Sequence, residues 1–146
     1  MLRVSIIAVG KIKQAGMRAE IDDYLGRIRR YATFEEIELK DGSDAELQPR
    51  FERALPKRAR VVALEVEGKP VTSQGLADVV RRAELDATPL AFLIGGAYGL
   101  PKAVSKAAHV QLSLSAMTLP HRLARLVLAE QIYRAFTILR GEPYSH

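Results

Sequence analysis

The sequence predicts an α/β protein with a mostly parallel sheet and helices on both faces. Apolar runs of strand length alternate along the chain with segments of helical periodicity, a pattern typical of βαβ units. The run at residues 89–94 is almost entirely apolar, as expected of a strand buried in a parallel sheet. A length of 146 residues, 48% of them hydrophobic and 27% charged, indicates one globular domain over residues 1–146.

The first half of the chain predicts two strands and two helices. An apolar run ends at Gly10, and Ile21, Leu25 and Ile28 then recur at helical spacing. The next strand alternates imperfectly because acidic residues interrupt it. The predicted elements are a strand over 3–9, a helix over 17–31, a strand over 34–39 and, after a turn at 41–44, a helix over 45–55.

The second half predicts three strands, two shorter helices and one long helix. Residues 67–70, Glu-Gly-Lys-Pro, read as a tight turn, and Thr72 or Ser73 caps the helix that follows. Pro120 suits the first turn of a helix because its missing N–H would be unpaired there, and the Thr118 hydroxyl can cap that start. The predicted elements are strands over 60–66, 89–94 and 110–114 and helices over 73–85, 100–108 and 122–140.

Two loops follow predicted strands and offer backbone to a ligand. Residues 112–121 are small, apolar or hydroxylic before Pro120, and Gly95-Gly96-x-x-Gly99 lets a ligand approach the chain closely. Taken alone, each motif favours an ordinary structure, a strand–loop–helix junction at 112–121 and a plain turn at 95–99. The strand ends at Leu64, Ile94 and Leu114 would face one edge of a parallel sheet, where such sheets bind ligands.

Charge and composition indicate which partners and which cellular compartment to expect. The net charge is +5, and most of it lies in residues 101–146. A basic excess beside a ligand loop suggests a polyanion such as nucleic acid, although a solvated basic face is the alternative. The basic residues of this third are Lys102, Lys106, Arg122, Arg125, Arg134 and Arg140. There is no cysteine, signal peptide or membrane-length apolar run in the sequence, so we expect a cytoplasmic protein.

The three histidines do not form a metal site. His109 precedes a strand and is interpreted as structural, His121 starts the long helix beside the loop, and His146 is the last residue. No pair has the spacing of metal ligands, and no G-x-S-x-G motif supports hydrolase chemistry.

The long helix is apolar over more than half its circumference, so it must bury two faces. We expect one face to cover the sheet and the other to meet a second subunit in a two-fold dimer. The alternative is a helix sandwiched within one domain. The apolar residues are Leu123, Ala124, Leu126, Val127, Leu128, Ala129, Ile132, Tyr133, Ala135, Phe136 and Leu139.

Three ordered motifs carry a resemblance to a known family. Residues 92–96 (FLIGG), 112–121 (LSLSAMTLPH) and 128–136 (LAEQIYRAF) together resemble the ribosomal RNA large-subunit methyltransferase H family, which are small SPOUT-class enzymes. Residues 4–10 and 67–70 also match, so the resemblance covers essentially the whole chain.

The resemblance implies a C-terminal trefoil knot, a homodimer and S-adenosylmethionine bound in the knot. It also implies methylation of N3 of a pseudouridine in large-subunit (23S) rRNA of the ribosome. Carried over by position, the implied cofactor contacts are Leu64, Gly95, Leu114, Ser115, Ala116, Met117, Thr118 and Leu119.

Two departures from the family pattern concern catalysis. Ala97 and Tyr98 replace a proline and an acid in the glycine loop, and the tail at 143–146 reads Pro-Tyr-Ser-His in place of Pro-Tyr-His-Arg. The implied reaction requires that the N3 proton is removed and that the target nucleobase is held in position. The candidate catalytic residues are His121, Arg134, Tyr144 and His146, and the general base stays unassigned. A non-catalytic RNA- or ribosome-binding dimer that keeps the fold is the competing interpretation.

Overall fold

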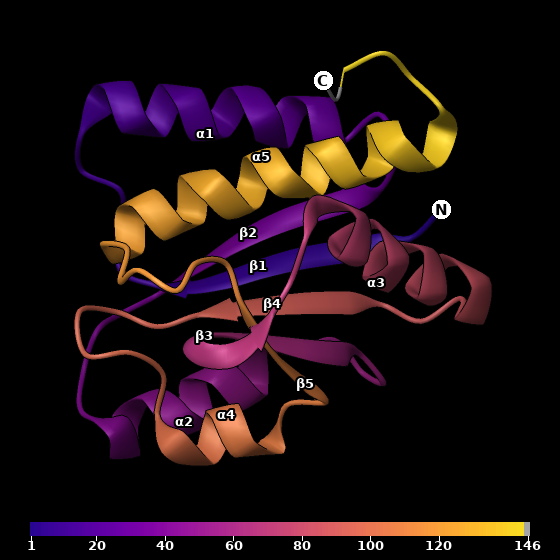
Figure 1. The fold of residues 1–146 in the computed structure, drawn as a ribbon. Helices are drawn as coiled ribbons and strands as arrows, with labels where there is room; N and C mark the ends of the chain where they lie inside the picture. Colours follow the sequence, from indigo (N-terminus) through magenta and orange to yellow (C-terminus); the bar gives the residue numbers. More distant parts are fainter. Residues whose placement is uncertain (145–146) are drawn as a thin grey trace.

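In the computed structural model, which describes residues 1–144, the predicted alternation becomes one five-stranded sheet with helices on both faces (Figure 1). The strands are β1 (Arg3–Val9), β2 (Thr33–Leu39), β3 (Arg60–Pro70), β4 (Leu90–Ile94) and β5 (Val110–Ser113). The helices are α1 (Ala15–Ile28), α2 (Asp44–Ala54), α3 (Ser73–Asp86), α4 (Lys102–Ala107) and α5 (His121–Arg140). No helix within residues 1–144 has the length and apolarity needed to cross a membrane.

The strand order is β2-β1-β4-β3-β5, and every neighbouring pair is parallel. The imperfectly alternating strand is real, since β2 pairs with β1 from Thr33 to Leu39. Because all five strands run the same way, their carboxyl ends meet at one edge. The prediction of a mostly parallel sheet with helices on both faces is confirmed.

Each face of the sheet carries its own apolar core. Helices α1, α3 and α5 cover one face, and the shorter α2 and α4 cover the other (Figure 1). Alternate side chains of β1 serve the two cores, so Ile6 packs under α1 and α5 while Ile7 packs toward α2 and α4. Two helices begin at predicted capping residues. Thr72 caps α3, and Ser43 forms a capping box with Glu46 at the start of α2.

Helix α5 lies between α1 and α3, over the middle of the sheet (Figure 1). Leu128, Ile132 and Phe136 are fully buried, and Leu123 and Val127 are half-buried. Much of the wide apolar surface of this helix is therefore buried within one chain, and the two-fold dimer stays a prediction. The sandwiched helix is the arrangement observed.

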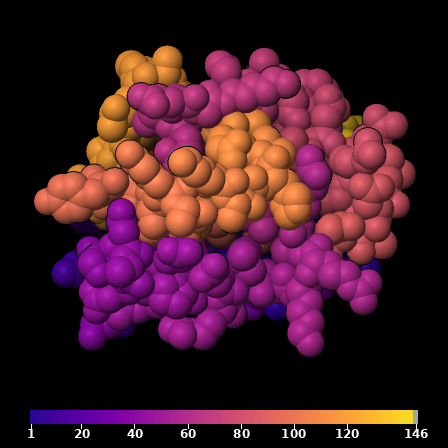
Figure 2. Space-filling model, turned by 90° about the horizontal axis from the view of Figure 1, so that it is seen from below, coloured from indigo at the N-terminus to yellow at the C-terminus, as the bar shows by residue number. Residues whose placement is uncertain are grey.

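Two local predictions at the ends of strands are wrong. Residues 67–70 do not form a tight turn but continue β3, and the residues at 64 and 69 both pair with Leu112 of β5. A Cβ on Gly68 would stand 2.9 Å from the Gln111 carbonyl, so only glycine allows this close crossing. Figure 2 shows this stretch of β3, in magenta, against the orange segment that contains β5.

The start of α5 also differs from the prediction. The helix begins at His121, Pro120 is the residue that precedes it, and no side chain caps the first turn, so Thr118 is not a cap. His109 is structural as predicted. Its side-chain Nδ1 accepts a hydrogen bond from the backbone N–H of Val61 at 2.9 Å, and its backbone N–H donates to the Val61 carbonyl at 2.9 Å.

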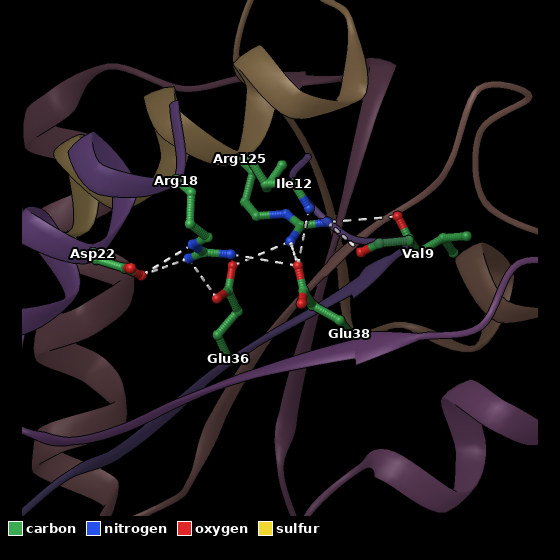
Figure 3. Close-up of polar contacts among 8 residues, drawn as sticks. Val9, Ile12, Arg18, Asp22, Glu36, Glu38 and Arg125 are labelled. Atoms are coloured by element: carbon green, nitrogen blue, oxygen red, sulfur yellow. Dashed lines mark hydrogen bonds and ion pairs between the residues drawn. The ribbon is translucent and has the colours of Figure 1, made fainter. Parts of the chain in front are cut away.

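A buried cation fastens the first turns of α5 to the sheet (Figure 3). Arg125 is only 1% exposed, and its guanidinium bonds to the carboxylates of Glu36 and Glu38 and to the Gly10 carbonyl at 2.9 Å. Arg18 of α1 joins the same two carboxylates, at 2.7 Å and 3.4 Å. The charges of β2 that face α5 are thus neutralised by two arginines.

This network corrects the charge argument made from the sequence. Arg125 counted toward the basic excess of the last third, yet it is buried and paired and cannot meet a polyanion. Arg134 pairs with Glu130 at 2.8 Å, and Arg140 pairs with Glu84 at 2.7 Å. The exposed cations of this third that make no ion pair with a residue in 1–144 are Lys102, Lys106 and Arg122.

Replacing Arg125 with leucine should lower the free energy of unfolding by about 3 kcal/mol, because two partly buried carboxylates lose their shared cation. Urea denaturation followed by circular dichroism measures this change. The matched control is Arg82→Leu, which removes an exposed ion pair to Asp86 and should cost less than about 0.5 kcal/mol. Equal losses in the two variants would contradict a structural role for the buried network.

Candidate functional site

A cavity of about 460 Å³ opens at the carboxyl edge of the sheet. This volume lies within the range of small-molecule sites. The second half of β3, the loop after β4, the loop after β5 and the first turn of α5 enclose it. The lining residues are Leu64, Glu65, Val66, Ile94, Gly95, Gly96, Ala97, Gly99, Leu114, Ser115, Met117, Thr118, Leu119, Pro120, His121 and Ala124.

The glycine loop folds back on itself at the floor of this cavity. The Gly99 N–H donates to the Gly96 carbonyl at 3.0 Å, and Gly99 has a φ of +81°, which favours glycine. A Cβ on Gly95 would lie 2.2 Å from the backbone carbon of Gly99. The close return of the chain therefore requires glycine at 95, which the sequence motif alone did not reveal.

The loop before α5 forms the opposite wall, and its own hydroxyls hold its bend. The Ser113 hydroxyl donates to the Ser115 carbonyl at 2.8 Å, and the Ser115 hydroxyl accepts the Met117 N–H at 3.0 Å. No residue of this loop before His121 is ionisable. A ligand at this wall would meet backbone, small side chains and apolar surface.

The structure brings together seven of the eight residues expected from the resemblance. Ala116 is the exception, because it is exposed and does not line the cavity. The seven that do are Leu64, Gly95, Leu114, Ser115, Met117, Thr118 and Leu119. Sequence reasoning missed Glu65 and Val66, which line the cavity because β3 continues past residue 64.

The candidate catalytic residues are divided between two places. His121 lines the cavity, but Arg134 and Tyr144 do not. Thirteen residues separate His121 from Arg134 on one helix, which is about 20 Å along its axis. His146 lies outside the described residues. Within one chain, therefore, the cavity and the Arg134–Tyr144 pair are separate sites.

The tail folds back onto α5 and forms a polar cluster there. Glu130 accepts hydrogen bonds from Arg134 at 2.8 Å and from the Tyr144 hydroxyl at 2.8 Å. The Arg134 guanidinium stands 5.0 Å from the centre of the Tyr144 ring, which also meets the ring of Tyr133 edge-on at 4.6 Å. We call Glu130, Arg134 and Tyr144 the tail cluster.

The protonation state of the tail cluster limits what it can do. Burial raises the pKa of the Tyr144 phenol above its ordinary value, and the hydrogen bond to Glu130 raises it further. The same carboxylate raises the pKa of the Arg134 guanidinium. At neutral pH both groups are therefore hydrogen-bond donors, and Tyr144 in this position is not a base.

The chain matches known proteins over its whole length. A family model described as "Predicted SPOUT methyltransferase" matches residues 2–146. The chain is 52% identical over 146 residues to the ribosomal RNA large subunit methyltransferase H of Sorangium cellulosum (strain So ce56), covering 99% of this chain and 100% of that protein. It is 43% identical over 157 residues to the protein of the same name from Bacillus pumilus (strain SAFR-032), covering 98% and 99%.

Solved structures share the fold at low sequence identity. A probable methyltransferase from Bordetella pertussis Tohama I has a TM-score of 0.63 at 19% identity, covering 92% of this chain and 94% of that one. The SpoU methyltransferase AviRb from Streptomyces viridochromogenes, solved in complex with AdoMet, has a TM-score of 0.51 at 12% identity, covering 97% and 59%. The sequence matches and this fold together show that the chain belongs to the SPOUT methyltransferases, within the ribosomal RNA large subunit methyltransferase H family.

Proposed function

We propose that this chain, as one SPOUT domain over residues 1–146, uses S-adenosylmethionine to methylate N3 of a pseudouridine in large-subunit rRNA. The observation that carries the proposal is the cavity at the carboxyl edge of the sheet, whose walls include two of the three motifs that carry the family resemblance, at residues 92–96 and 112–121. The relatives that match over the full chain are named for methylation of large-subunit rRNA.

The residues of the cavity fit the proposed cofactor. An adenine ring needs apolar surface and backbone partners, and a sulfonium is better tolerated beside backbone carbonyls or a carboxylate than beside a cation. Apolar side chains from Leu64, Ile94 and Leu114 supply the surface, the loop at 114–119 supplies backbone, and Glu65 supplies a carboxylate. The cavity lining contains no lysine or arginine.

The chain supplies positioning and proton removal. The bound cofactor supplies an electrophilic methyl group, and transfer needs an in-line approach by the nucleophile. His121 lines the cavity. Its imidazole is the side chain best placed to accept the N3 proton from a pseudouridine held there. The glycine loop and the residues at 114–119 hold the walls in place without charged side chains in the way.

The tail cluster acts in this proposal from a second copy of the chain. Because Arg134 and Tyr144 stand away from the cavity of their own chain, a two-fold dimer is the arrangement that lets one protomer's tail reach its partner's cavity. We also infer a trefoil knot, which is consistent with the second pairing of β3 onto β5 and the close crossing at Gly68. The dimer is expected in sedimentation velocity at micromolar concentration.

Methylation of ribosomes is the direct test of the function. Ribosomes from cells that lack this protein, incubated with purified protein and labelled S-adenosylmethionine, should gain one methyl group on large-subunit rRNA, and mass mapping should locate it on N3 of a pseudouridine. Binding of ribosomes without any methyl transfer would instead favour a non-catalytic RNA-binding dimer.

Replacing Gly95 with valine should abolish cofactor binding. A Cβ at this position already overlaps the backbone of Gly99, so the variant must open the glycine loop. Titration calorimetry with S-adenosylmethionine should show at least a tenfold weaker affinity. Gly26→Ala in α1 is the matched control, because its new Cβ meets nothing within 4 Å and should leave the affinity unchanged. Wild-type affinity in Gly95→Val would remove the cavity as the cofactor site.

Deleting residues 143–146 should leave folding, dimerisation and cofactor affinity nearly intact, because terminal residues contribute little to the core. Methyl transfer should fall about a hundredfold or more, since a positioning group is lost. His146→Ala should reproduce much of this loss. Tyr144→Phe should be milder, because it keeps the ring contact with Tyr133 and loses only the bond to Glu130. Wild-type rates after the deletion would exclude the tail from catalysis and leave His121 and Arg134 as the candidates.

A further inference from the structure

Exposed apolar side chains gather around the mouth of the cavity. Within residues 1–144, the large apolar side chains that are exposed are Met1, Val66, Leu85, Tyr98 and Met117. Val66 and Met117 line the cavity, and Tyr98 stands between the lining residues at 97 and 99. Three of the five thus come from the three loops that enclose one opening, and such clusters mark interaction surfaces.

Tyr98 is the most exposed member of this group. Its exposed fraction is 103%, so its ring contacts almost nothing else in the chain. The backbone beneath it forms a closed turn, in which Gly96 and Gly99 are bridged. The segment between β4 and α4, in salmon, projects from the left of the molecule in both Figure 1 and Figure 2. The turn therefore presents the whole aromatic ring to solvent, where a flat ligand can reach it.

The surroundings of Tyr98 favour a polyanion over a protein or the cofactor. Lys102 starts α4 three residues after the turn, Lys106 lies one helical turn further, and Arg122 follows the lining residue His121. All three cations are exposed and unpaired among the described residues, so a protein interface would have to desolvate them. The ring itself stands clear of the cavity walls, so a ligand held inside would not reach it.

We propose that Tyr98 stacks on an unpaired base of the RNA substrate at the mouth of the cavity, while Lys102 and Arg122 contact the flanking phosphates. The inference rests on the proposed RNA methyltransferase function. Sequence-tolerant recognition of unpaired RNA combines aromatic faces with cations that follow the backbone, and Tyr98 and the exposed cations at 102 and 122 supply both.

Three substitutions at one position test the stacking. Tyr98→Ala should raise the KM for ribosomes about tenfold or more at unchanged S-adenosylmethionine affinity. Tyr98→Phe should keep the wild-type KM because it keeps the ring, and Tyr98→Leu should resemble Tyr98→Ala because it is apolar without a flat face. Leu85→Ala is the matched control, since Leu85 is 71% exposed on α3 and does not line the cavity.

Direct binding separates this inference from the proposed function. Fluorescence anisotropy at fixed salt should show that Tyr98→Ala weakens binding of a single-stranded RNA oligonucleotide more than binding of its duplex. If the wild type transfers no methyl group to ribosomes, the proposed function fails, and this comparison still decides the role of Tyr98. A wild-type KM and RNA affinity in Tyr98→Ala, an equal defect in Tyr98→Phe, or loss of dimers in sedimentation would each overturn the stacking proposal.

Discussion

The buried guanidinium of Arg125 is the interaction on which the arrangement of the site depends. It joins three elements that are distant in sequence: the carboxyl end of β1 through Gly10, the acidic strand β2 through Glu36 and Glu38, and the first turns of α5. An unpaired guanidinium could not be buried there, nor could two carboxylates face a helix without cations. The pairing therefore determines where α5 begins, and with it where the loop at 114–120 ends.

The cavity follows from that anchorage and from two glycines. Helix α5 holds one wall in place, the return of the chain at Gly95 forms the floor, and the crossing at Gly68 carries β3 far enough to add Glu65 and Val66. None of the three features contributes a reactive group. They shape a site made mainly of backbone and apolar surface, in which chemistry depends on how a ligand is held.

The alternation of strands and helices was predictable from the sequence, because each element carries its own periodicity and its own caps. The continuation of β3 was not, because Glu-Gly-Lys-Pro has the composition of a turn and only the nearby β5 backbone explains Gly68. Arg125 was misread as a surface charge, although it falls on the buried face of α5. The residues that share this face at helical spacing are Leu128, Ala129 and Ile132. The position of Tyr144 beside Glu130 depends on how the chain turns at Gly141, which no local pattern specifies.

The position of α5 over the middle of the sheet has a consequence for the synthesis of the protein. The helix is made last, yet it covers the middle of the sheet between α1 and α3 (Figure 1). Until it leaves the ribosome, the part of this face that α5 covers stays open, and Glu36 and Glu38 of β2 have no cation apart from Arg18. The nascent chain therefore carries an open apolar face through most of its translation, when aggregation competes with folding. The core is completed, and the cavity closed, only once α5 has packed onto the sheet.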